Sequence, residues 1–516
     1  MRHRLLAALA VAGATAPLAP QALAAQTESN RYLPVASWTT PYVEHLIRAG
    51  VLTGLDPLTR PLRRADVARA VAAVDTSVVA ESVRGTLRLL AHELEERPDT
   101  VRWKLEANLA ALGASDASRW TVRPAGHSPR IFIEGGLEAS LEFPHVAMVT
   151  APYFDTRLIH DPQFAGKKGP TMVAGDNAGA SVMGSWKYVD VFFGIEPRNW
   201  GPPEVEGLVL STSPYPYDHL LLRLGPRRFR LELLATQLDD LTAWDSEFVA
   251  KRFLSVHRLI VIPSDRLAFS LSEAAVYPDN GGPSRSFEPW FLNPVNLWIL
   301  PNFNHIPSVN TLWAGDVSYR LRGGVGLAAQ IYLDDIQVNN HGGSMNKPAV
   351  WGYTFVATGG GLRGGLSWSA LYTRVDNLNY RTEANEEQYT LYGVGLARDH
   401  DDYDQWTARA TVAPAPRALL AGEFTLLRQG EGDIRTRIPS DSTWATVQGF
   451  LTGVVERTYR MAVQATWTPL DGVNLSTDVG RHFLHNAGHV SGQRSGRWVW
   501  RVRAEIRRRL TGAVRW

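Results

Sequence analysis

The carboxy-terminal stretch Arg497-Trp-Val-Trp-Arg-Val-Arg-Ala-Glu-Ile-Arg-Arg-Arg-Leu510 alternates apolar and charged side chains, shortly before the chain ends on Trp516. Successive side chains of a β-strand point to opposite faces. One face would therefore carry Trp498, Trp500, Val502, Ala504 and Ile506, and the other would carry the arginines and Glu505. Val499 and Arg508 each break the pattern once. An apolar face opposite a charged face is typical of a strand that separates lipid from a water-filled barrel interior.

The same alternation recurs from about residue 130 onward. It is clear over residues 133–143, 325–334 and 459–468, where apolar residues alternate with Glu, Gln, Arg and Thr. The connections alternate between tight turns such as Thr468–Gly472 and long polar loops such as Gln429–Thr443. Short turns belong on the periplasmic side of an outer-membrane barrel and long loops outside. Roughly 390 residues in strands of about 10 residues predict an antiparallel barrel with an even number of strands, between about 16 and 20.

The amino terminus has the features of a secretory signal peptide. Arg2 to Arg4 are basic, an apolar run follows to about Ala19, and Ala22-Leu23-Ala24 offers a small-x-small cleavage site. We therefore assign residues 1–25 to a signal peptide and expect the mature protein in the bacterial outer membrane. Cysteine is absent from all 516 residues, so disulfides and thiolate metal sites play no part.

Residues 26–112 differ from the rest of the chain and predict a small helical periplasmic domain. A first helix begins near Thr40-Pro41 and ends near Gly50, a second covers about residues 64–73, and a third runs from about Ser77 to Arg97 before Pro98. Residues 113–516 are then assigned to the barrel.

Composition and motifs argue against several functions. The 53 basic and 51 acidic residues nearly cancel, so no global field favours nucleic acid. The sequence has no G-x-S-x-G elbow and no phosphate-binding loop, so we expect no catalytic residues and no cofactor. The 17 Trp and 16 Tyr suit a barrel whose interfaces are ringed by aromatic residues.

Two internal stretches are unusual for barrel strands. The first is Pro197-Arg-Asn-Trp-Gly-Pro202 with the following Gly207–Ser211, and the second is Phe287-Glu-Pro-Trp-Phe-Leu-Asn-Pro-Val-Asn-Leu-Trp298. With the helical amino-terminal domain and the terminal aromatic residue, they resemble the capsule-assembly Wzi family of outer-membrane proteins. The resemblance implies an 18-stranded barrel over a periplasmic helical bundle. It also implies a lectin-like outer face that helps to hold capsular polysaccharide.

Both stretches supply candidate residues, either for polysaccharide binding or for a plug in the lumen: Asn199, Trp200, Glu288, Trp290 and Asn293. A Trp beside Asn and Arg can stack on a sugar, but a Trp-Gly-Pro corner also suits an inward-folded loop, and we favour the plug. Prolines interrupt strand pairing, so we expect residues 287–301 to fold into the barrel or over its mouth. Glu288 would then be neutralised by a lumenal arginine.

Two charged groups complete the candidates. The arginines Arg501, Arg503, Arg507 and Arg509 should face the lumen, either to attract an acidic polysaccharide or to pair with Glu134, Glu138 and Glu142; we favour pairing, with the two sets on neighbouring strands. Asp399, Asp401, Asp402 and Asp404 form a weak calcium candidate, because hard oxygen ligands cluster there without the spacing of a dedicated loop.

The function we expect from the sequence is a non-enzymatic outer-membrane barrel that binds surface polysaccharide and helps to assemble or anchor capsule or exopolysaccharide. Its expected partners are capsular or extracellular polysaccharide, outer-membrane lipid and lipopolysaccharide, and we expect a monomeric barrel. Two alternatives remain open: a porin-like channel for solutes, and an outer-membrane hydrolase with a serine–histidine pair at the rim.

Overall fold

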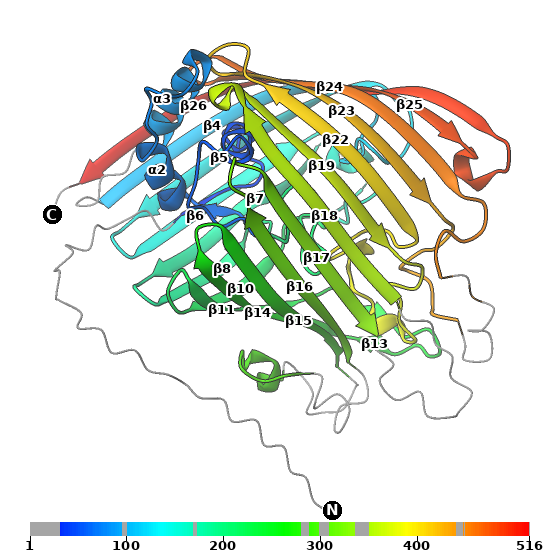
Figure 1. Ribbon diagram of the computed structural model, residues 1–516. Helices are drawn as coiled ribbons and strands as arrows, with labels where there is room; N and C mark the ends of the chain where they lie inside the picture. The colour runs from blue at the N-terminus through cyan, green and yellow to red at the C-terminus, as the bar shows by residue number, and fades with distance from the viewer. Residues whose placement is uncertain are drawn as a thin grey trace, which may run out of the picture.

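The chain forms a closed antiparallel barrel of 18 strands with a short helical segment at one end (Figure 1). The computed structural model describes residues 31–94, 101–168, 173–279, 288–298, 309–335, 350–439, 447 and 449–514. The assigned signal peptide lies outside these residues. The strand number agrees with the range expected from the length of the chain.

Each barrel strand pairs with its neighbours in the chain, and the last strand, β26, closes the wall against the first, β4. The strands are β4 (Val101–Ala114), β5 (Arg130–Glu142), β6 (Val146–Asp155), β7 (Ala174–Ser185), β8 (Val189–Ile195), β10 (Asp218–Leu224), β11 (Phe229–Gln237), β14 (Arg252–Ser264), β15 (Leu267–Pro278), β16 (Asn310–Arg320), β17 (Gly326–Asp335), β18 (Val350–Gly361), β19 (Leu366–Val375), β22 (Tyr403–Val412), β23 (Ala418–Gln429), β24 (Glu456–Leu470), β25 (Val473–His485) and β26 (Arg494–Val514).

The two faces of the wall follow the alternation in the sequence. On β26, Trp498 and Ile506 are exposed on the outside, while Val499 and Glu505 are buried on the inside. Val463 of β24 is 54% exposed and Leu327 of β17 is 43% exposed. A barrel with a wet or filled interior and an apolar exterior is of the outer-membrane type. None of the described helices is long and apolar enough to cross a membrane.

The wall begins earlier than the sequence boundary at residue 113, because β4 covers Val101–Ala114. Trp103, Leu105 and Leu109 face outward on this strand, and Lys104 and Glu106 are only partly exposed on the other face. The expected boundary was therefore wrong. The strand contains Leu109-Ala-Ala-Leu112, residues that favour helices as strongly as strands, and tertiary pairing with β26 and β5 decides its structure.

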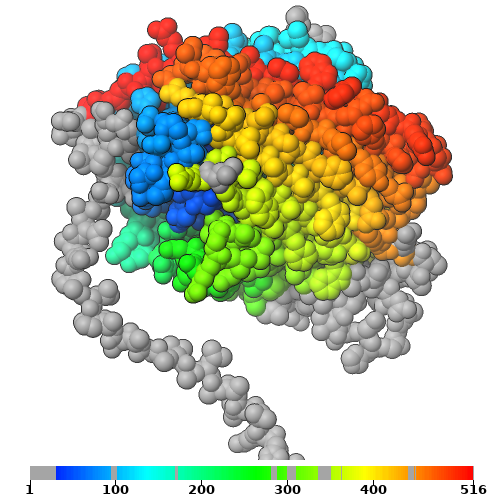
Figure 2. Space-filling view, turned by 45° about the horizontal axis from the view of Figure 1, so that its top comes forward, coloured from blue at the N-terminus to red at the C-terminus, as the bar shows by residue number. Residues whose placement is uncertain are grey.

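The helices are α1 (Thr40–Arg48), α2 (Arg64–Ala72) and α3 (Glu81–Glu93), close to the three expected. They sit at the end of the barrel that carries the short turns, beside the β18–β19 and β22–β23 turns (Figure 2). Tyr42 donates its hydroxyl to the carbonyl of Arg417 at 2.6 Å, and the His45 ring bonds Ser367 and the carbonyl of Gly364. The helical segment is therefore packed against the barrel wall.

Long and short connections alternate around the barrel. The end of β26 lies at the short-turn end, on the side that carries the helices (Figure 1). The opposite end carries the long connections, among them the described residues 115–129, 156–168, 196–217, 376–402 and 430–439. By the rule for such barrels, the helices face the periplasm and the long loops face the outside.

Candidate functional site

The first unusual stretch lies inside the barrel. The connection 196–217 turns inward from the outer end, and its short strand β9 (Asn199–Trp200) pairs with β2 (Thr59–Arg60) of the amino-terminal segment. The Trp200 side chain is 1% exposed, and the Arg258 guanidinium lies 5.2 Å from its ring centroid. Trp200 is therefore a plug residue, and its ring has no surface to offer to a polymer outside.

Local hydrogen bonds explain why this loop needs its residues. The Asn199 side chain accepts from the backbone N–H of Gly207 at 2.6 Å and donates to the carbonyl of Val205 at 3.1 Å. A Cβ at Gly207 would stand 2.2 Å from the Trp200 carbonyl oxygen, so only glycine permits this approach. The Gln330 side chain of β17 accepts from Leu208 N and donates to Trp200 O. The loop is held as an ordered plug.

A second connection from the outer end, residues 376–402, also packs inside the lumen against the loop 196–217. Tyr380 donates its hydroxyl to the carbonyl of Leu208 at 2.8 Å, and Tyr389 donates to that of Val209 at 2.7 Å. Both tyrosines belong to a buried apolar cluster that also includes Trp200 and inward-facing side chains of β10, β11, β14, β15, β16 and β17. Two outer loops and the amino-terminal segment together fill this part of the lumen.

The arginine ladder of β26 faces the lumen, as expected, but the expected strand neighbours were wrong. Strand β4 lies between β26 and the glutamates of β5. Arg503 still reaches Glu134 at 2.8 Å, while Arg509 pairs with Glu106 of β4 at 2.6 Å. Arg507 lies 3.7 Å from Glu106, and Arg501 donates to loop carbonyls.

The remaining glutamates of β5 have other partners. Glu138 pairs with Arg31 and Lys104, and Glu142 pairs with Arg102 and Arg31. The expected neighbours were wrong because residues 101–112 were assigned to the helical domain. These residues form most of β4, which lies between β26 and β5. These ion pairs mean that the ladder acts mainly in structure rather than as a free basic surface.

The second unusual stretch does not enter the barrel. Its described part, residues 288–298, packs on the outer face of β11, β14 and β15. Phe291 stacks on Tyr277 and Trp298 stacks on His257, each with ring centroids 4.1 Å apart. Tyr277 shares its strand face with the exposed Phe269 and Leu271, which places the contact on the outer wall. The expectation of a lumenal or mouth-covering segment was therefore wrong.

A polar pair on the outer wall explains why this segment is held there. His257 Nε2 lies 2.9 Å from a Glu273 carboxylate oxygen, on the face that otherwise carries apolar side chains. The same carboxylate accepts from the backbone N–H of Trp298 at 2.9 Å. Charged groups facing lipid are costly, and the aromatic cover removes these from it. Glu288, Trp290 and Asn293 belong to this cover, which places Glu288 near Tyr277 on the outward face of the barrel and not in the lumen, where its neutralising arginine was expected.

The four aspartates of the calcium candidate point to different partners. Asp399 pairs with Arg435, and Asp404 with Arg428. Asp401 accepts from Leu378 N, and Asp402 accepts from the backbone N–H groups of Gly432 and Thr452. Across the part of the chain that the structure describes, no group of three or more His, Asp or Glu is arranged to hold a metal ion. These side chains brace loops instead.

Five outer loops converge on a cluster that the sequence did not reveal. We call Arg119, Trp120, Gln163 and Tyr215 the mouth cluster. The Arg119 guanidinium lies 3.9 Å from the Tyr215 ring centroid, and Trp120 Nε1 donates to Gln163 Oε1 at 2.7 Å. Gln163 in turn donates to Asp399 at 2.7 Å, and Asp399 is paired with Arg435 of the connection 430–455.

The mouth cluster combines the groups that recognise sugars. Its two aromatic rings are partly exposed, and guanidinium and amide donors stand beside them. Burial raises the pKa of Tyr215 above its ordinary value, and its hydroxyl donates to Asp161 at 2.7 Å. Its members are far apart in the sequence, so no local motif identifies them. Arg119 and Trp120 are the only two members of the mouth cluster that are adjacent in the sequence.

Among the residues that the structure describes, one serine hydroxyl is hydrogen-bonded to a histidine ring, and this pair is buried at the periplasmic end. Ser367 Oγ lies 2.8 Å from His45 Nδ1, and His45 Nε2 bonds the Gly364 carbonyl at 3.0 Å. Burial, with a contribution from Arg48, lowers the pKa of His45 to about 4. Both ring nitrogens are committed and the side chain is 1% exposed, so the pair anchors α1 and has no access to substrate.

Comparison with solved structures gives a similar barrel in Wzi of Escherichia coli, an outer-membrane protein involved in group 1 capsule assembly and a carbohydrate-binding β-barrel. The TM-score is 0.60 at 13% sequence identity, covering 92% of this chain and 98% of that chain. OprD of Pseudomonas aeruginosa aligns with a TM-score of 0.43 at 10% identity, covering 79% of this chain and 95% of that chain. No family model and no curated protein sequence matches the chain. The structural likeness to Wzi agrees with the resemblance seen in the sequence and establishes the shared fold.

Proposed function

We propose that this protein binds a surface polysaccharide through its outer loops and helps to assemble or anchor capsule or exopolysaccharide, without catalysis. The observation that carries the proposal is the filled lumen. Trp200, Tyr380 and Tyr389 form one buried cluster with the barrel wall, held by side-chain hydrogen bonds to loop carbonyls. A diffusion channel needs a continuous wet path, whereas a binding protein needs a rigid platform for its outer surface.

The mouth cluster supplies the contact chemistry of the proposal. Trp120 offers a partly exposed ring, which Gln163 fixes in place. Arg119 packs over the Tyr215 ring and donates to the carbonyls of Ser213 and Pro214, so it holds the cluster together beside that ring. One such site binds a sugar weakly, but a polymer engages many barrels on the same cell, and repetition supplies the avidity. The known carbohydrate binding of Wzi, which shares the fold, supports the same conclusion.

Retention of polysaccharide on cells tests the proposal. A deletion strain should shed polysaccharide that the parent strain keeps, and the wild-type gene should restore retention. Trp120→Ala should weaken binding of the purified polysaccharide by about tenfold in surface plasmon resonance, because truncation of one anchoring aromatic typically costs ~1–2 kcal/mol. Trp186→Ala is the matched control, since Trp186 is an exposed tryptophan at the opposite, short-turn end. Equal retention by deletion and parent strains contradicts the anchoring role.

Conductance separates the proposal from the channel alternative. The full-length protein in a planar lipid bilayer should show no open-pore current, because the plug blocks the lumen. Gly207→Val should displace the loop by clashing with the Trp200 and Leu210 carbonyls and produce current steps. Wild-type protein that conducts small solutes at a steady rate would favour a porin instead.

A further inference from the structure

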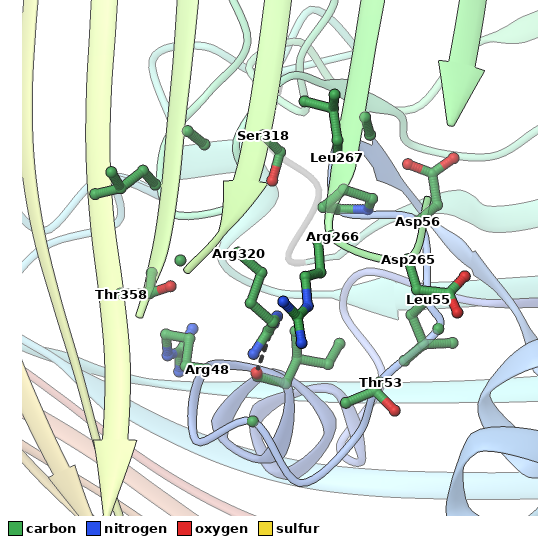
Figure 3. A pocket seen from close by; sticks show the side chains of 18 of the residues that line it. Arg48, Thr53, Leu55, Asp56, Asp265, Arg266, Leu267, Ser318, Arg320 and Thr358 are labelled. Carbon is green, nitrogen blue, oxygen red and sulfur yellow. Dashed lines mark hydrogen bonds between the residues drawn. The ribbon is translucent and has the colours of Figure 1, made fainter. Parts of the chain in front are cut away.

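A cavity of about 390 Å³ lies at the periplasmic end of the lumen, away from the mouth cluster. Its walls come from the end of α1 and the loop after it, and from the turns β10–β11, β14–β15 and β16–β17. Figure 3 shows Arg266 and Arg320 side by side, with Arg320 pointing to the end of α1 and Arg48 nearby. The volume suits one small polar molecule or one unit of a polymer.

Five guanidinium groups line this cavity, those of Arg48, Arg227, Arg266, Arg320 and Arg322, and of these Arg48 interacts electrostatically with Glu44 and Glu204. None of them makes an ion pair with any residue that the structure describes. Several other lumenal arginines are matched by a carboxylate, as in Arg503–Glu134, Arg230–Asp56 and Arg460–Glu423, whereas Arg409 and Arg501 make no ion pair with the described residues. This cavity differs in that it gathers five such guanidinium groups in one place.

The acids of the lining do not neutralise these arginines. Asp56 is held by Arg230 at 2.5 Å, and the guanidinium groups of Arg230 and Arg258 overcome the effect of burial and hold its pKa at about 2. Asp265 is highly exposed and lies 3.7 Å from Arg228, which is outside the lining. Glu204 remains, and one carboxylate cannot balance five guanidinium groups.

Backbone contacts hold two of the arginines in place and leave donors free. Arg320 donates one N–H to the carbonyl of Ile47 at 3.4 Å, and Arg227 donates to the carbonyl of Gly54. A guanidinium has five N–H donors, so several remain for a ligand. Arg266 and Arg322 make no side-chain hydrogen bond with the described part of the chain. Leu52, Ile262 and Val356 add an apolar patch to the lining.

We propose that this cavity is a periplasmic oxyanion site, which takes a carboxylate or phosphate group carried on a small polar unit such as an acidic sugar or a lipid headgroup. Like charges gathered in a partly enclosed cavity repel one another, and an anion relieves that repulsion while accepting charge-assisted hydrogen bonds. The site faces the periplasm, so its ligand arrives from the side opposite to the mouth cluster. The inference is independent of polysaccharide binding outside.

The test is calorimetric titration of the full mature chain in neutral detergent with glucuronate, inorganic phosphate and glucose at low salt. The two anions should bind and glucose should not, and binding should weaken as salt is raised. The double variant Arg266→Gln/Arg322→Gln should lose at least about tenfold in affinity for both anions, because it removes two charged donors that hold no other structure. Arg69→Gln is the matched control on the exposed face of α2.

Three results would overturn the proposal: no binding of either anion, equal binding of glucose, or affinity that the double variant keeps. Heat-modified mobility on gels verifies that each variant is folded. Repeating the titration in nanodiscs distinguishes the sources of the anion. If phosphatidylglycerol blocks phosphate binding and phosphatidylcholine does not, the oxyanion is a headgroup; if both discs bind phosphate equally, the site takes a soluble anion.

Discussion

Acidification should loosen the contact of α1 with the barrel, because His45 is docked in its neutral form. Its pKa is about 4 in the folded protein, against an ordinary value of 6.5. At a pH between these two values, His45 is protonated when α1 is released and neutral when α1 is docked. The stabilisation is therefore complete above about pH 6.5 and is lost as the pH falls toward 4.

The size of the effect follows from the same two values. At 1.36 kcal/mol per pKa unit, the full loss is about 3 kcal/mol, and about 2 kcal/mol of it falls between about pH 7.5 and 5. The population in which α1 is released should accordingly rise by about 25-fold over that interval. The barrel wall should not respond in this way, which makes its strands an internal reference.

Hydrogen exchange measured by mass spectrometry can follow this change, with exchange rates corrected for their intrinsic dependence on pH. Amides of Tyr42–Arg48 should lose protection relative to the barrel strands at the lower pH. His45→Gln should remove the pH dependence, whereas His92→Gln, at an exposed position on α3, should retain it. Unchanged protection of α1 at both pH values, or a His45→Gln protein that still loosens at low pH, would refute the reasoning.

Three further predictions concern the barrel. Arg460→Met should destabilise the folded barrel by up to ~3–5 kcal/mol in urea titrations, because it leaves the partly buried Glu423 and Asp478 without their cation; a loss below about 1 kcal/mol would contradict this. Val463→Arg on the lipid face should cost up to ~2–4 kcal/mol, and Gln464→Arg on the lumenal face should cost much less; equal losses would contradict the assigned faces. Trp298→Ala should expose His257 and make residues 288–298 sensitive to protease, while the barrel stays intact; unchanged proteolysis would show that the ring does not hold the cover.

The strand pattern was predictable because lipid on one side and a polar interior on the other impose a strict period of two. The same pattern in Trp498, Val463 and Leu327 therefore matched the structure. Strand β4 was missed, since its alanines and leucines carry no propensity that separates strand from helix, and only pairing with β26 and β5 settles the choice. Because β4 was missed, the arginines of β26 were expected to lie next to the glutamates of β5, whereas β4 separates the two strands.

The candidate site was predictable only in part. Trp200 was recognised as a plug residue because a Trp-Gly-Pro corner suits a tight inward loop, but the strand β2 that meets it lies far away in the sequence. The segment with Phe291 and Trp298 was misplaced, because aromatic residues and prolines identify an irregular segment without indicating which wall it packs on. The mouth cluster and the arginine cavity are each assembled from separate loops, so only the fold brings them together.

The short ladder between β2 and β9 also shows how far apart in the sequence the parts of the plug lie. Its halves come from residues before the first wall strand and after β8, while Gln330 and Tyr380, which hold it, come from later parts of the chain. The centre of the lumen is therefore filled only where segments from four separate parts of the chain meet, whereas each wall strand needs only its two neighbours.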